Sequence, residues 1–287
     1  MRLRPIAPAD FDWFADRGAA ADLRRIVASA SQYDGVEPLN EEATLALRHE
    51  GLRGASLWLA EDAGFALVQD ELLNLVVDPV SRGRGVATAL LNNVVNARDT
   101  SLHAWSHVDH PAAGALARAY DFDRVRDLWV MGRALAPGSS GSAALRTFEA
   151  DNLAAIVRIN ARAFAWHPEQ GHLTEADFQR RMGESWFDPS GLIVALVDGQ
   201  IGGFHWTKIH PGQIGEVYVV AVDPDFSGRG IGKALTEAGL AHLHEQGCTR
   251  VILYVDADNT AATRLYEGLG FTKIRGEAQY SRPAADS

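Results

Sequence analysis

Apolar residues in the second half of the chain follow two spacings, one typical of helices and one typical of strands. Helical spacing occurs at 153–160, after Thr174, from 230 onward and at 260–269, whereas runs typical of strands occupy 145–148, 192–197, 201–209, 216–222, 251–255 and the residues from 271 onward. Asp198 and Gly199 supply a turn of positive φ between two of these strands, which predicts a hairpin. Because strands and helices alternate only in part, the pattern predicts a mixed α/β sheet.

The chain contains a two-unit internal repeat. The segment 77–90 (VDPVSRGRGVATAL) returns at 222–235 (VDPDFSGRGIGKAL), so that Asp223 follows Asp78 by 145 positions. A repeat of this length indicates a duplicated domain, because the units of a solenoid span only tens of residues. Residues 137–142 between the copies lack an apolar anchor, as linkers do. We therefore predict an N-terminal domain at 1–136, a linker at 137–142 and a C-terminal domain at 143–287.

Composition narrows the class of partner. The 287 residues include 27 Lys and Arg against 37 Asp and Glu, a formal net charge of −10, which argues against bulk binding of nucleic acid or of an anionic membrane. No apolar run approaches the roughly 18 residues of a spanning helix, and the start does not resemble a signal peptide. We therefore expect a cytoplasmic protein, and we expect a monomer.

Cysteine and histidine usage argues against a metal centre. The single cysteine, Cys248, allows no internal disulfide and no thiolate cluster. His103, His107 and His110 have no carboxylate or cysteine at a spacing typical of zinc ligands. We therefore expect no bound metal.

A glycine-rich loop at 227–232 follows a predicted strand and precedes a predicted helix. Backbone N–H groups of such a loop can point at an anion, and the dipole of the following helix adds favourable potential. Two familiar phosphate motifs do not fit, because Ala234 occupies the Ser or Thr position of a P-loop and Lys233 the third glycine of the dinucleotide fingerprint. A plain strand-to-helix turn would explain one such loop, but its recurrence at 82–87 favours a pyrophosphate site of another kind.

Two motifs together resemble the GNAT N-acetyltransferases. The first is the pattern Arg/Gln-x-x-Gly-x-Gly/Ala, found at 82–87 and, with Ser227 at its first position, at 227–232. The second is the closing segment Asn259-x-x-Ala262-x-x-Leu265-Tyr266-x-x-Leu269-Gly270-Phe271. The resemblance implies an α/β fold of two tandem acyl-CoA N-acyltransferase domains, each a mixed, mostly antiparallel sheet flanked by helices. It also implies acetyl-CoA as the co-substrate.

Segments of the second half are similar to a narrower group of tandem GNAT enzymes. The matching stretches are 164–171, 184–193, 203–211, 215–220 and 253–255. That group acetylates the cysteinyl amine of 1D-myo-inositol 2-(L-cysteinylamino)-2-deoxy-α-D-glucopyranoside, so the resemblance implies this cysteinyl-glucosaminyl-inositol as the small-molecule amine substrate.

Acetyl transfer from a thioester to an amine requires a deprotonated amine, a stabilised oxyanion and protonation of the departing thiolate. On the resemblance, Glu216 is the candidate base, Tyr266 the candidate acid, and the backbone N–H groups of 220–222 the oxyanion donors. Taken alone, Glu216 would be an outward strand glutamate and Tyr266 a core aromatic. The first copy has Ala117 and His110 at the positions of Tyr266 and Asn259, so we predict catalysis in the C-terminal domain and a degenerate N-terminal domain.

The resemblance also assigns binding residues. Its acetyl-CoA contacts fall on Leu75, Val76, Val77, Gly83, Arg84, Gly85, Val86, Ala87 and Thr88 in the first copy, and on Val220, Ala221, Val222, Ser227, Gly228, Arg229, Gly230, Ile231, Gly232, Lys233, Asn259, Thr260, Ala261, Ala262, Thr263 and Arg264 in the second. Its substrate contacts fall on Glu41, Glu169, Lys208, Glu216 and Tyr254. A cationic amine favours nearby carboxylates, and sugar hydroxyls favour charged or hydroxylic partners.

Two other functions stay open from the sequence. One is a tandem GNAT enzyme for another primary amine, such as an aminoglycoside or a peptide N-terminus. The other is a sensor that binds acetyl-CoA without catalysis, against which the complete set of Glu216, Asn259 and Tyr266 argues. Composition and spacing do not identify the acceptor amine.

Overall fold

The structure is a computed structural model that describes residues 3–137, 144–167 and 170–284. The chain divides into two compact units, Met1–Leu128 with Arg275–Ser287, and Trp129–Ile274. The boundaries of these units differ from those of the sequence repeat. The chain enters the second unit at residue 129, before the end of the first copy, and returns to the first unit at residue 275, before the end of the second copy. The predicted linker lies outside the described residues except for Pro137, and the boundaries at 136 and 143 stay a prediction for the duplicated segments.

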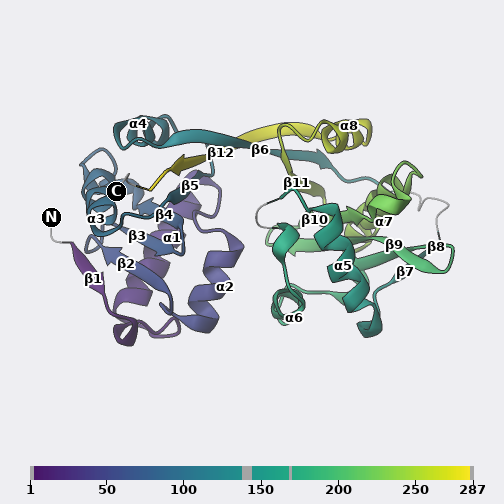
Figure 1. The fold of residues 1–287 in the computed structure, drawn as a ribbon, viewed down its shortest axis with the longest axis horizontal. Helices are drawn as coiled ribbons and strands as arrows, with labels where there is room; N and C mark the ends of the chain where they lie inside the picture. Colours follow the sequence, from purple (N-terminus) through teal and green to yellow (C-terminus); the bar gives the residue numbers. More distant parts are fainter. Residues whose placement is uncertain (1–2, 138–143, 168–169, 285–287) are drawn as a thin grey trace. The chain divides into compact units, whose positions relative to one another are not determined.

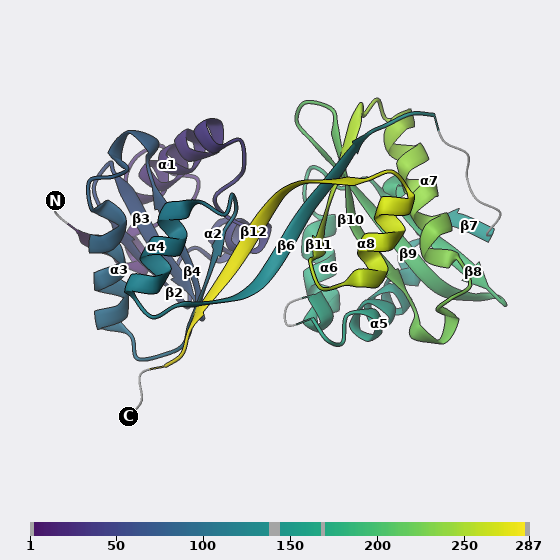
Figure 2. The same ribbon diagram turned by 90° about the horizontal axis from the view of Figure 1, so that it is seen from above.

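The first unit is a sheet with helices packed against it (Figure 1, Figure 2). Its elements are β1 (Arg4–Ile6), α1 (Ala19–Asp34), α2 (Glu41–Glu50), β2 (Ala55–Leu59), β3 (Gly64–Gln69), β4 (Leu72–Val77), α3 (Val86–Ala97), β5 (Leu102–Ser106), α4 (Pro111–Ala119) and parts of β6 (Asp123–Ala134) and β12 (Thr272–Arg282). The strands follow the order β1-β2-β3-β4-β5-β12. Residues 278–282 of β12 pair with β5, so a segment from the end of the chain extends this sheet.

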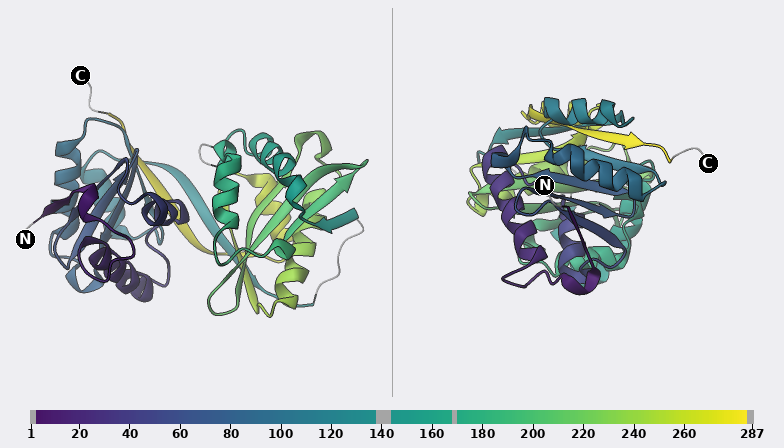
Figure 3. Two further views of the ribbon diagram at one scale, coloured as in Figure 1. Left: turned by 90° about the horizontal axis from the view of Figure 1, so that it is seen from below. Right: turned by 90° about the vertical axis from the view of Figure 1, so that its left-hand side faces the viewer.

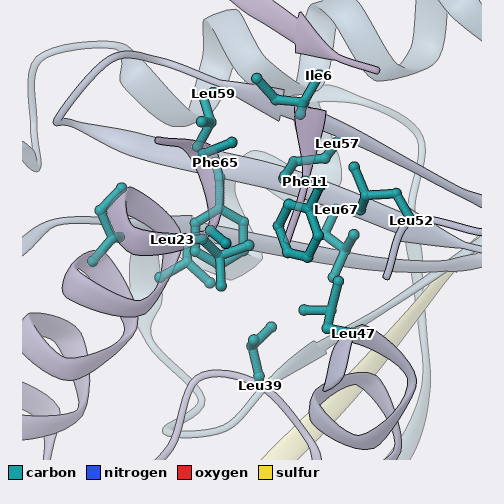
Figure 4. Packing of buried hydrophobic residues seen from close by; sticks show 14 of the residues in the cluster. Ile6, Phe11, Leu23, Leu39, Leu47, Leu52, Leu57, Leu59, Phe65 and Leu67 are labelled. Atoms are coloured by element: carbon teal, nitrogen blue, oxygen red, sulfur yellow. The ribbon is translucent and has the colours of Figure 1, made fainter. Parts of the chain in front are cut away.

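Strict alternation along β3 separates two apolar cores in the first unit. Phe65 and Leu67 are fully buried with Leu23 of α1 (Figure 4). The intervening Ala66 and Val68 are buried in the cluster that includes α3. Successive side chains of a strand point to opposite faces, and each face of this sheet is therefore covered by its own helices.

The second unit repeats this architecture. Its elements are β7 (Ala144–Thr147), α5 (Leu153–Ala163), α6 (Glu175–Met182), β8 (Leu192–Val197), β9 (Gln200–His210), β10 (Ile214–Val222), α7 (Ile231–Glu245), β11 (Arg250–Asp256), α8 (Thr260–Gly268) and the remaining parts of β6 and β12. β7 to β10 pair antiparallel and β10 pairs parallel with β11, which confirms the mixed sheet. Residues of α5 and α6 pack on one face and residues of α7 on the other (Figure 1, Figure 3).

Local sequence signals fix several element boundaries in the second unit. Asp198 and Gly199 both have positive φ, 51° and 79°, and they join β8 to β9 as predicted from the Asp-Gly pair. Thr174 and Asp177 form a reciprocal capping box at the start of α6. The strands predicted at 192–197, 201–209 and 216–222 coincide with β8, β9 and β10 to within two residues.

Candidate active site

The parallel strands β10 and β11 pair over only part of their lengths. The last paired residues are Val217 and Leu253, whereas β10 continues to Val222 and β11 to Asp256. Beyond Val217, the edge of β10 that faced β11 has no partner in this strand pair. Backbone N–H groups on such an edge can donate to a bound oxygen atom, and the predicted oxyanion donors at 220–222 lie on this stretch.

One extra residue in β10 marks the start of the parting. Val217 lies opposite Thr207 and Val219 lies opposite Trp206, so Tyr218 has no counterpart on β9. This is the geometry of a β-bulge, which bends a strand and increases its local twist. Tyr218 and Val219 both pack into the cluster on the α5 side of the sheet, so the bulge changes which residues of β10 face that side.

Glu216 lies on β10 immediately before the strands part. It is paired with Lys208 of β9 and Ile252 of β11 and is only 7% exposed. Its Oε2 lies 2.5 Å from Nε2 of His210. A buried carboxylate is stable only when it is hydrogen-bonded or paired, and His210 provides that partner.

Two of the predicted substrate residues share the face of Glu216. Lys208 lies directly opposite Glu216, and its Nζ lies 4.4 Å from the ring centroid of Trp186 and 5.2 Å from that of Tyr218. Tyr254 lies two residues beyond Ile252 on β11, where successive even positions point to one face. Tyr254 as a whole residue is 41% exposed, so it is accessible to a ligand.

The other two predicted substrate residues lie elsewhere. Glu41 is the first residue of α2, in the first unit. Glu169 lies outside the described residues. The structure therefore groups Lys208, Glu216 and Tyr254 on one face of the second unit's sheet, and the roles of Glu41 and Glu169 stay predictions.

Tyr266 lies on α8 and packs edge-on against Phe271, with ring centroids 5.8 Å apart. Burial raises the pKa of Tyr266 to about 12, because the phenolate would lose its hydration. The hydroxyl is therefore protonated throughout the physiological range. It can act as a proton donor and not as a base.

Replacing Tyr266 with Phe should lower kcat on the order of 10²-fold, the scale of a general acid, with little change in stability because the ring is retained. Since the phenol ionises only near pH 12, the wild-type rate should show no decline from Tyr266 deprotonation below about pH 11. Steady-state rates across pH for both proteins check this. An unchanged kcat would contradict the assignment of Tyr266 as the acid, and an alkaline decline near pH 10 that vanishes in the variant would contradict the raised pKa of its hydroxyl.

The glycine-rich loop presents its backbone outward. Gly228 and Gly230 both have a φ of 76°, a conformation that favours glycine, and a Cβ added at either would meet no atom within 4 Å. The N–H of Ala234 bonds to the carbonyl of Gly230 at 3.1 Å, so the amides of 231–233 are those that a helix start leaves open. The loop therefore has the form of an anion site at the start of α7.

Ion pairs between Arg162 and two aspartates hold the residues that precede the glycine-rich loop. Asp223 is buried and its carboxylate accepts the N–H of Asp225. Arg162 of α5 lies 2.8 Å from an oxygen of Asp223 and 2.9 Å from an oxygen of Asp225. The charged partners fix the strand end from which the loop starts.

Three predicted acetyl-CoA segments meet at Gly232. A Cβ at Gly232 would lie 3.5 Å from Val222 at the end of β10 and 3.9 Å from Leu265 of α8. Asn259 caps α8 by accepting the N–H of Ala262 at 3.1 Å, and Thr263 is buried against its own helix. The strand end, the loop and α8 thus adjoin one another within the second unit.

The first copy retains the loop but engages its arginine. Gly83 and Gly85 have φ values of 72° and 78°, and Arg25 of α1 pairs with the buried Asp78 as Arg162 pairs with Asp223. However, Arg82 makes hydrogen bonds of 2.7 and 2.6 Å to the carboxylate of Asp34. These bonds raise the pKa of Arg82. The guanidinium of Arg82 is thus already paired with a carboxylate of the protein itself.

The first copy also lacks the bulge. β3 and β4 pair without interruption from Gln69 opposite Leu72 to Gly64 opposite Val77. Glu71, at the sequence position that corresponds to Glu216, therefore lies in the turn before β4, where it accepts a hydrogen bond from Ser101. Loss of one strand residue moves every earlier position to the other face. The first sheet thus does not present a carboxylate at the position of Glu216.

His210 is a residue of this site that the sequence analysis did not identify. Its signal is the hairpin register: because His210 pairs with Ile214 and Lys208 with Glu216, His210 is the diagonal neighbour of Glu216 on the same face. Diagonal neighbours lie within reach of long side chains.

The fold and site define a tandem GNAT acetyltransferase. Residues 153–271 match the acetyltransferase (GNAT) family. A tandem GNAT protein from the clavulanic acid biosynthesis pathway has a similar fold, with a TM-score of 0.70, 16% identity, and coverage of 100% of this chain and 99% of that one. A GCN5-related N-acetyltransferase from Sphaerobacter thermophilus gives a TM-score of 0.68 at 24% identity, covering 100% of this chain and 97% of that one.

Curated relatives narrow this class. The mycothiol acetyltransferase of a Nocardioides species is 47% identical over 92% of this chain and 99% of its own length. That of Thermobispora bispora is 46% identical over 90% of this chain and 94% of its own. The chain belongs to the mycothiol acetyltransferase family. Among the described residues, no helix is long and apolar enough to cross a membrane.

Proposed function

We propose that this protein transfers the acetyl group of acetyl-CoA to the cysteinyl amine of cysteinyl-glucosaminyl-inositol, which yields mycothiol. The observation that carries the proposal is Glu216, a buried carboxylate beside the point where β10 and β11 part. The printed names of relatives that match nearly the whole chain support the acceptor. The segments 164–171 and 203–211 support it by resemblance.

Each requirement of the reaction has a candidate group in the second unit. Glu216 removes a proton from the ammonium form of the substrate, which gives a nucleophilic amine. The N–H groups of 220–222 donate to the carbonyl oxygen as it gains negative charge. Tyr266 donates its proton to the thiolate sulfur that leaves.

The start of α7 supports the binding of acetyl-CoA. Its open amides and the helix dipole favour a pyrophosphate group, and the outward face at Gly228 and Gly230 leaves room for it. Ser227 contributes no charge where GNAT loops usually have Gln or Arg, so the backbone carries the interaction. Arg229 and Lys233 add positive charge, although they pair with Asp198 at 3.6 Å and Glu237 at 3.8 Å.

We assign a non-catalytic role to the first unit. It retains the loop at 82–87 with its positive φ at Gly83 and Gly85, which favours retention of a CoA site. The absence of the bulge and the displacement of Glu71 argue against acetyl transfer there.

Thiol release and product mass test the proposed function. The purified protein is given acetyl-CoA with the cysteinyl-glucosaminyl-inositol, and glucosaminyl-inositol and free cysteine serve as control acceptors. Rapid CoA release with the full acceptor, and an acetyl group that survives hydroxylamine and therefore lies on nitrogen, would support the proposal. Binding of acetyl-CoA without turnover on this acceptor would overturn it in favour of another primary amine.

A further inference from the structure

The imidazole of His210 connects the buried carboxylate of Glu216 with the surface. Its Nε2 lies 2.5 Å from Oε2 of Glu216. The side chain of His210 is 33% exposed and that of Glu216 is 9% exposed. His210 is the last residue of β9, so its ring lies at the end of the sheet, with one nitrogen on the carboxylate and part of its surface in solvent.

Acetylation of an ammonium group releases one proton in each turnover. Two N–H bonds of the ammonium group break and the N–C bond forms, the thioester C–S bond breaks, and of the two protons one goes to the sulfur and one is left over. A carboxylate that has accepted a proton must lose it before the next cycle. For a buried group, that loss requires an acceptor in contact with it or a path to water.

The described residues on the face of Glu216 include a lysine and two tyrosines, which are side chain types that do not readily accept a proton. Lys208 lies opposite on β9 and is a donor when charged. Tyr218 accepts a hydrogen bond from Arg181 of α6 at 3.0 Å, and Tyr254 follows on β11. Phenols and guanidinium groups hold their protons in this range. Imidazole is the side chain that gains and loses a proton readily there.

We propose that His210 is a relay residue that takes the substrate proton from Glu216 and passes it to water. The proton moves from the amine to Oε2 of Glu216, from there to Nε2 of His210, and finally leaves the ring to solvent or buffer. The relay rests on the proposed function, since it requires Glu216 to act as the base. His210 is also a positioning residue, because its hydrogen bond to Glu216 orients the carboxylate.

The variant His210→Gln separates relay from positioning. Glutamine can donate a hydrogen bond to Glu216 but cannot carry a proton, whereas His210→Ala removes both functions. His244→Gln is the matched control, because His244 lies on α7, which packs on the opposite face of the sheet. Initial rates of acetylation are measured for all four proteins in a weak, dilute buffer and then with increasing imidazole. The Kd for acetyl-CoA is measured in parallel.

The relay predicts a buffer-dependent defect. In dilute buffer, His210→Gln should lose on the order of 10-fold in kcat, and His210→Ala should lose more because it also removes the hydrogen bond to Glu216. Both losses should stay below the 10²-fold or more expected from loss of the base itself. Imidazole should restore much of the rate in both variants, with little effect on the wild type or on His244→Gln. Acetyl-CoA affinity should be unchanged.

Two results would overturn the relay, and a third would refute the proposed function on which it rests. Wild-type rates in His210→Gln would show that the proton leaves by another route. A slow rate that imidazole does not raise in either variant would show that His210 only orients Glu216. Wild-type protein that acetylates no amine would instead refute the proposed function, since the comparison of variants starts from a measurable wild-type rate.

Discussion

Replacing Glu216 with Gln should lower kcat by about 10³-fold and leave the Kd for acetyl-CoA within about twofold. General acid–base catalysis contributes 10²–10⁴-fold, and an amide cannot take the ammonium proton. Gln retains the size of the side chain and can still bond to His210, so the sheet should fold unchanged. The predicted acetyl-CoA contacts are on the loop and helix starts. Steady-state rates and calorimetric binding of acetyl-CoA check the two halves of the prediction.

The first copy provides the matched control for this variant. Glu71→Gln makes the same chemical change at the corresponding sequence position, but Glu71 lies in the turn before β4. Its kcat should equal that of the wild type. A loss below tenfold in Glu216→Gln, or an equal loss in Glu71→Gln, would remove Glu216 as the base. A large loss of acetyl-CoA affinity in Glu216→Gln would point to a structural effect.

The sequence predicts the elements of the second unit because their signals are local. The Asp198-Gly199 turn requires positive φ, and the apolar periods of β8 to β10 need no knowledge of the rest of the chain. The glycine loop is likewise encoded in a short segment. These features were confirmed at nearly the predicted residues.

The position of the base could not be judged from the repeat alone. Constant spacing makes Glu71 the counterpart of Glu216, but spacing along the chain does not show which residues oppose each other across strands. The bulge at Tyr218 exists in β10 and is absent from β4. A difference of one strand residue decides which face a side chain takes, and register depends on packing between strands.

Contacts between segments that are distant in the chain also could not be predicted from the sequence. The sequence does not assign His210 to the site because its contact with Glu216 follows from hairpin register, and the Arg82–Asp34 pair joins residues far apart in the chain. The pairing of residues 278–282 with β5 in the first unit also cannot be predicted from the repeat. The repeat predicts a closing strand in each copy but does not show which of the two sheets that strand joins.

Replacing Gly239 with Ala should destabilise the second unit by about 3 kcal/mol, at the upper end of typical overpacking costs. Gly239 lies in α7 where the helix crosses the fully buried ring of His205, and a Cβ there would overlap Cε1 of that ring. The ring cannot move aside easily, because its Nδ1 lies 2.8 Å from the carbonyl oxygen of Leu235. Urea unfolding of the variant measures the loss.

Gly232→Ala is the control in the same helix. A Cβ at Gly232 would meet its nearest neighbour at 3.5 Å, an ordinary contact, and alanine favours helix by up to about 1 kcal/mol over glycine. This variant should therefore be as stable as the wild type or slightly more stable. Equal destabilisation by both substitutions would show that α7 tolerates no side chain at either site, whatever its distance from His205.

The double variant His205→Ala with Gly239→Ala identifies the ring as the cause. Burial lowers the pKa of His205 to about 4, so at neutral pH the ring is uncharged and its single N–H serves Leu235. Removing it loses one hydrogen bond and opens space in which the new methyl group can lie. The two substitutions should therefore be less than additive, with a coupling energy of about 1–3 kcal/mol. Strict additivity would contradict a steric contact between residue 239 and His205, and the cost of Gly239→Ala would then lie in the helix itself.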